Sequence, residues 1–83
     1  MQSSQITSAQ IRAARGALGW SVQELGIRTE VSPATIKRYE LASGVPRSRK
    51  GHLVSIRTAF EKAGIIFIGA PDDDPGIRIR TEV

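Results

Sequence analysis

Residues 21–40 read S-V-Q-E-L-G-I-R-T-E-V-S-P-A-T-I-K-R-Y-E, and this stretch decides the fold. Ser21 followed by Glu24 three positions later is the capping-box pattern that marks the start of a helix. A second helix start follows at Ser32, because serine caps helices well and Pro33 is tolerated in the first helical turn. The turn between the two expected helices is very short, so they cannot lie antiparallel. We therefore expect them to cross steeply.

These two helices can share a small core. Gly26 is small at the point where the helices approach each other, and the apolar side chains that can fill the space between them are Leu25, Val31, Ile36 and Tyr39. With these residues turned inward, the start and outer side of the second helix face solvent. This arrangement is typical of a helix-turn-helix motif, whose second helix enters the major groove of DNA. The residues left outside are Pro33, Ala34, Thr35, Lys37 and Arg38.

Apolar residues spaced three and four apart predict one further helix on each side of this pair. The earlier helix covers residues 8–18 and ends at Gly19, and we expect residues 1–7 to be disordered. The later helix starts around Ser48 and closes at Gly64. Its apolar stripe consists of Leu53, Ile56, Phe60 and Ala63.

After Gly64 the sequence pattern changes from helical to alternating. Residues 65–68 form a short apolar strand signal, and residues 77–83 alternate strictly. The segment 69–76 between them is rich in glycine, proline and aspartate, which predicts a long turn. We expect a β-hairpin that packs on the helices and whose free edge pairs with a second copy of the chain. The residues expected at this dimer contact are Ile66, Ile68, Ile77, Ile79 and Thr81.

The composition excludes several classes of protein. A chain of 83 residues fits one small domain, and without cysteine it has no disulfides, zinc fingers or thiol catalysis. His52 stands alone, and Asp72–Asp74 lacks the spaced ligands of a calcium loop, so we expect no metal site. No nucleophile–base pair stands out, so we expect no enzyme, no cofactor and no small-molecule substrate. The start resembles no signal peptide and no apolar run is long enough to cross a membrane, which favours the cytoplasm.

Basic residues concentrate in the middle of the chain, whereas residues 61–83 carry more acidic than basic side chains. The basic side chains of the middle third are Arg28, Lys37, Arg38, Arg47, Arg49, Lys50 and Arg57. A polyanionic partner and a merely soluble basic surface are both compatible with the charge alone. We expect Arg12 and Arg15, on the earlier helix, to be ordinary surface charges.

The stretch 21–40, followed by Gly44-Val-Pro46, resembles the Cro/repressor-type (XRE) helix-turn-helix family. The resemblance covers about residues 8–63 and rests on the ordered set Ser21, Glu24, Leu25, Val31, Ser32, Ile36, Glu40, Gly44 and Pro46. It implies a mainly α fold, in which a four-helix, lambda-repressor-like core over residues 8–64 is followed by the hairpin over residues 65–83. It also implies a bacterial or phage regulator that binds double-stranded DNA as a homodimer, more often as a repressor.

The resemblance also points to site residues. Arg38 is the strongest candidate for base contact, because a guanidinium can bind guanine at two points; Thr35, Ala34 and Pro33 accompany it. The candidates for phosphate contact are Ser21, Gln23, Ser32, Lys37, Arg47, Ser48, Arg49 and Lys50. Two positions depart from the family pattern, because Glu30 stands where glycine is usual and Val22 where a phosphate-binding glutamine is usual.

A second function stays open. The chain could be an antitoxin-like or adaptor module whose hairpin binds a partner protein, with DNA binding secondary. A toxin-sized neighbouring gene would favour this alternative. An RNA-binding domain is disfavoured, because the sequence lacks the exposed aromatic residues that stack on bases.

Overall fold

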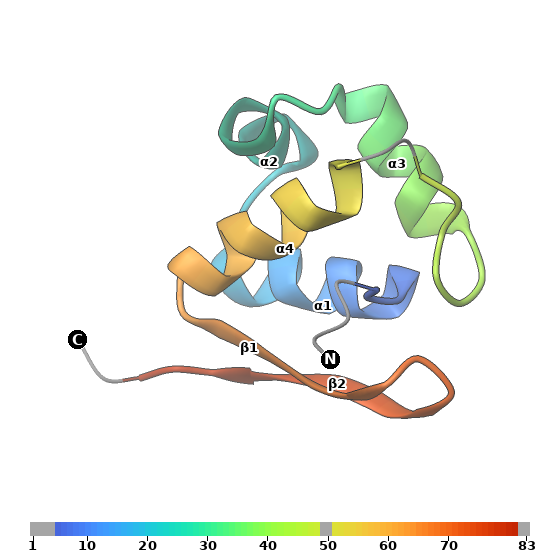
Figure 1. Ribbon diagram of the computed structural model, residues 1–83. Coiled ribbons are helices and arrows are strands. Elements are labelled where there is room, and N and C mark those ends of the chain that lie inside the picture. Colours follow the sequence, from blue (N-terminus) through green and yellow to red (C-terminus); the bar gives the residue numbers. More distant parts are fainter. Residues whose placement is uncertain (1–4, 49–50, 82–83) are drawn as a thin grey trace.

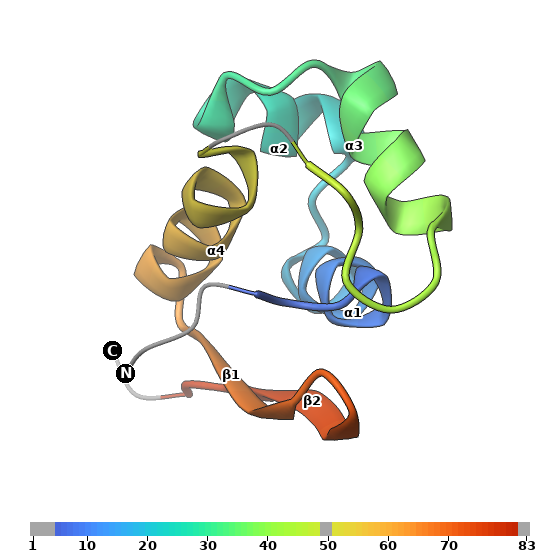
Figure 2. The same ribbon diagram turned by 45° about the vertical axis from the view of Figure 1, so that its right-hand side comes forward.

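The computed structural model describes residues 5–48 and 51–81. It contains four helices followed by a two-stranded hairpin, so the expected mainly α fold is confirmed. The hairpin lies beneath α1 and α4, and α2 and α3 lie on the opposite side of these two helices (Figures 1 and 2). None of the helices in the described residues has the length and apolar character of a membrane-spanning segment. The elements are α1 (Ser8–Leu18), α2 (Val22–Thr29), α3 (Pro33–Leu41), α4 (His52–Lys62), β1 (Ile65–Ala70) and β2 (Asp73–Ile79).

Helix α1 has the predicted bounds and begins with a complete capping box. The Gln10 N–H donates to Thr7 Oγ1 (3.1 Å), and the Thr7 N–H donates to Gln10 Oε1 (2.8 Å). This cap orders the chain before the helix, so the expected disorder of residues 1–7 is wrong for Ile6 and Thr7. Ile6 is only 1% exposed and belongs to the core. Residues 1–4 lie outside the described residues.

The predicted start of α4 is wrong. The helix begins at His52 instead of near Ser48, and its N-cap is Gly51 with φ +86°. A helix cannot run through a residue in this left-handed conformation, so α4 begins only after the glycine. The helix ends at Lys62, slightly before the expected Gly64, and its stripe of Leu53, Ile56 and Phe60 is buried.

The hairpin has a tighter tip and a different second strand from those predicted. Strand β2 spans Asp73–Ile79 and pairs antiparallel with β1, with Ala70 opposite Asp73. A register shift between Ile68 and Ala70 accommodates Gly69, which has φ +77°. This bulge lets the strands pair almost to the tip, because glycine adopts such a conformation without steric cost.

One face of the hairpin packs on the helices. Ile65 is 1% exposed within the core, and the Phe67 ring lies 6.1 Å from the Phe60 ring. Ile77, expected at a dimer contact, also packs partly against the core, so its side chain faces the helices. Gln10 adds a polar anchor, because its Nε2 donates to the Ile68 and Gly76 carbonyls (3.2 and 2.9 Å).

An ion pair joins α1 to α3. The Arg15 guanidinium donates to both carboxylate oxygens of Glu40 (2.7 and 2.9 Å), and it also donates to the Trp20 carbonyl (3.1 Å). Glu40 is 7% exposed, and its hydrogen bond raises the pKa of Arg15 above the ordinary value. Arg12 donates to the Glu40 carbonyl. Our expectation of an ordinary surface charge is therefore wrong for Arg15, because a buried carboxylate requires a charged partner. Arg12 is exposed.

Replacing Arg15 should destabilise the fold far more than breaking an exposed ion pair. Arg15→Ala leaves the Glu40 carboxylate buried without its partner, and we expect the free energy of unfolding to fall by about 3 kcal/mol. The matched control is Glu61→Gln, which breaks the exposed pair with Arg57 on α4 and should cost below about 0.5 kcal/mol. Urea denaturation of both variants measures the difference, and equal losses would contradict the assignment.

Candidate nucleic-acid interface

The turn between α2 and α3 depends on a residue in the left-handed conformation. Glu30 follows α2 with φ 60° and ψ 26°, and its N–H donates to the Gly26 carbonyl (2.7 Å). Glycine adopts this conformation without steric cost, whereas a residue with a side chain in this conformation lowers the stability of the fold by about 1 kcal/mol. The non-glycine residue therefore adopts the turn conformation at some cost in stability.

The close approach of the two helices explains the glycine inside α2. A Cβ atom on Gly26 would lie 2.9 Å from the Val31 carbonyl oxygen and 3.4 Å from the Pro33 ring. Beside it, the Thr29 hydroxyl donates to the Leu25 carbonyl (2.7 Å) and accepts from the Val31 N–H (3.3 Å). The turn is thus held by local hydrogen bonds and by direct backbone packing.

Helix α3 begins as predicted, with Ser32 as its N-cap and Pro33 as its first residue. Ser32 Oγ accepts from the Thr35 N–H (3.2 Å) and donates to Thr35 Oγ1 (2.9 Å). The Ser32 hydroxyl proton is therefore used in the hydrogen bond to Thr35, whose own hydroxyl proton can be donated to another acceptor. Pro33 and Thr35 are half-buried, and Ala34 is exposed.

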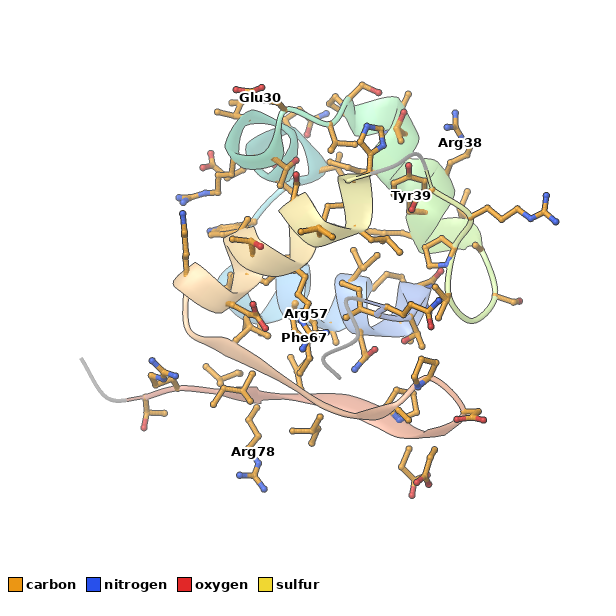
Figure 3. All side chains as sticks on the ribbon, in the orientation of Figure 1. Glu30, Arg38, Tyr39, Arg57, Phe67 and Arg78 are labelled. Carbon is orange, nitrogen blue, oxygen red and sulfur yellow. The ribbon has the colours of Figure 1, made fainter. Side chains whose placement is uncertain are left out.

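The outer side of α3 carries two cations. Ala34, Lys37, Arg38 and Leu41 are all exposed, and their spacing places them on one helix face. Arg38 projects away from the rest of the molecule (Figure 3). Neither Lys37 nor Arg38 forms an ion pair with a described residue. We call Ala34, Lys37, Arg38 and Leu41 the outer stripe of α3.

Residues 8–51 match a protein family described as a helix-turn-helix domain. The chain belongs to the helix-turn-helix domain family. No curated protein matches the chain. The helix-turn-helix match covers α1, α2 and α3 and ends at the N-cap of α4. Because helix-turn-helix domains bind DNA and are typically not enzymes, the chain is a DNA-binding protein of a kind that regulates transcription.

The residues expected to contact phosphate come from three parts of the helix-turn-helix domain. Ser21 caps α2 by accepting from the Glu24 N–H (3.0 Å). Ser21, Gln23 and Lys37 line one shallow hollow between the start of α2 and the end of α3. The exposed residues Arg47 and Ser48 lie in a loop that passes beside α3 (Figures 1 and 2). Arg49 and Lys50 lie outside the described residues.

Besides the ion pair and the hydrogen bond from Arg12, hydrogen bonds of Ser8 and Tyr39 hold α3 and the loop after it from behind. Ser8 Oγ donates to the Tyr39 carbonyl (2.6 Å) and the Gly44 carbonyl (3.2 Å), while the Tyr39 hydroxyl lies 2.7 Å from His52 Nδ1. His52 thus connects α3 to the start of α4. In the described part of the chain, no three histidine, aspartate or glutamate side chains gather as metal ligands.

Sequence reasoning missed two features of α3. It assigned no partner to Glu40, although the glutamate shares the inward face of α3 with Ile36 and Tyr39, and an inward carboxylate needs a cation. It also omitted Leu41 from the outer stripe, because leucine in a helix is normally a core residue. Leu41 is 86% exposed. The helical spacing of Leu41 from Ala34 was the available signal.

Adding one methyl group at two glycines should have opposite effects. Gly26→Ala forces backbone atoms apart at the α2–α3 turn, and we expect it to lower the free energy of unfolding by about 2 kcal/mol. Gly16→Ala places the same group on α1 in open space. We expect it to raise the free energy of unfolding by about 0.5–1 kcal/mol, because alanine has a higher helix propensity than glycine. Thermal unfolding of both variants measures the effects. Destabilisation by both, or by neither, would contradict the close approach at Gly26.

Proposed function

We propose that this protein is a sequence-specific transcriptional regulator of the Cro/repressor type (XRE family), acting as a dimeric repressor in the bacterial or phage-infected cytoplasm. The observation that carries the proposal is the outer stripe of α3. It presents Lys37 and Arg38, without ion-pair partners among the described residues, on the second helix of a helix-turn-helix. That helix is the one that enters the major groove in this motif. Occupancy of an operator would block RNA polymerase.

Base readout is assigned mainly to Arg38. Its exposed guanidinium can donate to both N7 and O6 of a guanine, which gives discrimination of about 1–3 kcal/mol. Thr35 supplies a hydroxyl, whereas Ala34 and Pro33 offer only apolar contact, such as with a thymine methyl group. Direct readout per half-site is therefore modest, and DNA shape supplies the remaining specificity.

Phosphate contacts fix the position of α3 in the groove. The N-termini of α2 and α3 offer backbone N–H groups and the positive ends of helix dipoles near Ser21, Gln23 and Ser32. Side-chain contacts come from Lys37, from the loop residues Arg47 and Ser48, and from Arg49 and Lys50, which lie outside the described residues. These contacts contribute affinity without sequence information.

Two copies of the chain are needed to bind paired half-sites. We assign residues 8–64 to DNA binding and residues 65–83 to dimerisation. Ile66 and Ile68 on β1 offer apolar surface for this purpose, because they are 39% and 37% exposed. Ile79 on β2 is 54% exposed and lies on the other face of the hairpin, where it is opposite Ile65. Thr81 is exposed beyond the end of β2.

Binding to duplex DNA should weaken steeply with salt. Each phosphate contact releases counterions, and contributes about −0.9 to the slope of log K against log salt concentration. A fluorescent duplex selected from a random pool, titrated with protein between about 50 and 200 mM salt, measures this slope by anisotropy. A flat response would contradict the phosphate contacts. Selection from the pool also reports the spacing of half-sites.

Two adjacent substitutions on the outer stripe separate base contact from phosphate contact. Arg38→Ala should weaken binding to the selected sequence by about 1–3 kcal/mol and relax the preference at one base pair. Lys37→Ala should weaken binding to all sequences alike and reduce the salt slope by about 1. Competition with single-base variants of the selected duplex measures both effects. Identical behaviour of the two variants would refute the division of roles.

A further inference from the structure

The two strands of the hairpin differ in how their free edges are protected. Strand β2 contains Asp73, Asp74, Pro75 and Arg78, and charges and proline are common means of preventing strands from pairing with other chains. Strand β1, Ile-Ile-Phe-Ile-Gly-Ala, contains none of these residues. In the described residues its sole ladder partner is β2. The free edge of β1 therefore has neither the charges nor the proline that would prevent another strand from pairing with it.

The register shows which backbone groups face this edge. The Arg80 N–H donates to the Gly64 carbonyl (2.7 Å), so this pair points its hydrogen-bonding groups into the hairpin. In an antiparallel ladder such pairs alternate, so the groups of Ile66 and Ile68 also point toward β2, and those of Ile65 and Phe67 point away from it. Ile65 is 1% exposed, so Phe67, which is half-buried, carries the groups that a second copy can reach. No backbone hydrogen bond outside the hairpin involves Ile65 or Phe67 in the part of the chain that the structure describes.

These outward groups are self-complementary about Phe67. We propose that β1 pairs antiparallel with β1 of a second copy, with the two-fold axis at Phe67 and four strands in the order β2, β1, β1, β2. Ile66 of each copy then lies opposite Ile68 of the other. Both side chains are on the face away from the helices, as is Arg78, which is opposite Ile66 in the hairpin and projects outward (Figure 3). Four isoleucines thereby form one apolar cluster.

This pairing suits the proposed function, on which the inference rests. The hairpin lies across the molecule from α2 and α3, and Arg38 and Arg78 project toward opposite sides (Figures 1 and 3). Edge pairing has its two-fold axis perpendicular to the sheet, so both copies of α3 face the same direction. Packing the outer faces of two sheets would direct the two copies of α3 away from each other and prevent binding to one operator.

The size of the molecule also fits. The chain measures 30 × 29 × 21 Å, so two copies side by side have centres separated by a distance within this range. Equivalent helices at the outer sides of such a dimer can lie farther apart than the centres. The separation between successive major grooves on one side of DNA is about 34 Å, which is slightly more than the longest extent of one copy.

A charge-complementation experiment tests the pairing. In Ile66→Glu/Ile68→Glu and in Ile66→Lys/Ile68→Lys, each new charge faces a like charge of the second copy, so each variant alone should sediment as a monomer. An equimolar mixture places opposite charges face to face and should regain the dimer mass of the unmodified protein. The control Arg78→Glu alters β2 on the same face, away from the axis, and should keep the dimer. Circular dichroism checks that every variant is folded.

Cysteine cross-linking tests the register, because the chain contains no native cysteine. Chains with Ile66→Cys should form disulfides with differently tagged chains carrying Ile68→Cys, and each variant alone should couple far more slowly. Identical positions are diagonal neighbours about 7–8 Å apart, beyond easy disulfide reach. Self-coupling of Arg78→Cys would place the dimer at β2 and overturn the proposal. The proposal would also be overturned if the unmodified protein were a monomer, or if the equimolar mixture of the folded glutamate and lysine variants stayed monomeric.

DNA binding is measured separately on the same proteins. If the unmodified protein binds the selected duplex as a dimer but shows another cross-linking pattern, the pairing of β1 is wrong and the proposed function stands. An unmodified protein that binds the duplex as a monomer would contradict both the pairing and the dimeric part of the proposed function. If the cross-linking pattern is as expected but no duplex is bound, the interface stands and the proposed function is wrong. The monomeric charge variants should still bind one half-site, more weakly than the dimer binds two.

Discussion

The ion pair between Arg15 and Glu40 is the contact on which the arrangement of the DNA-binding helix depends. A carboxylate on the inward face of α3 is stable only where a cation meets it, and only α1 supplies that cation in the described residues. The guanidinium also binds the Trp20 carbonyl, just before the start of α2. One side chain therefore joins α1 to α3 and to the segment just before α2. The orientation of α3 follows from this geometry and from the hydrogen bonds of Ser8 and His52.

Because the buried face of α3 makes the contacts that hold the helix in place, its outer stripe contributes little to the stability of the fold. Ile36, Tyr39 and Glu40 face inward, and the residues of the outer stripe are exposed. In the proposed function, substitutions on that stripe change which DNA sequence is bound and leave the fold intact. The turn before α3 shows the opposite situation, since Gly26 and Glu30 are constrained by backbone distances and angles.

Local signals made much of this fold predictable. Serine caps at Ser21 and Ser32 and the apolar spacing of α1 act over a few residues, and the structure confirms the three helix starts that they predicted. The start of α4 was misplaced because Gly51 adopts a left-handed conformation that the neighbouring sequence does not predict. The tip of the hairpin was misjudged because a bulge depends on pairing with the other strand. The partner of Glu40 is distant in sequence, so no local pattern could identify it. The individual DNA contacts stay predictions, since they depend on a second molecule.

Gln10 gives the fold a further property. Its Oε1 completes the cap of the first helix, while its Nε2 holds the carbonyls of the last two strands. The earliest and latest elements of the chain therefore share one side chain, and neither can loosen without weakening the other. Such a connection favours cooperative, all-or-none unfolding of the helices and the hairpin. During synthesis, α1 gains its full set of contacts only after β1 and β2 have emerged, so this contact forms after all four described helices have been made.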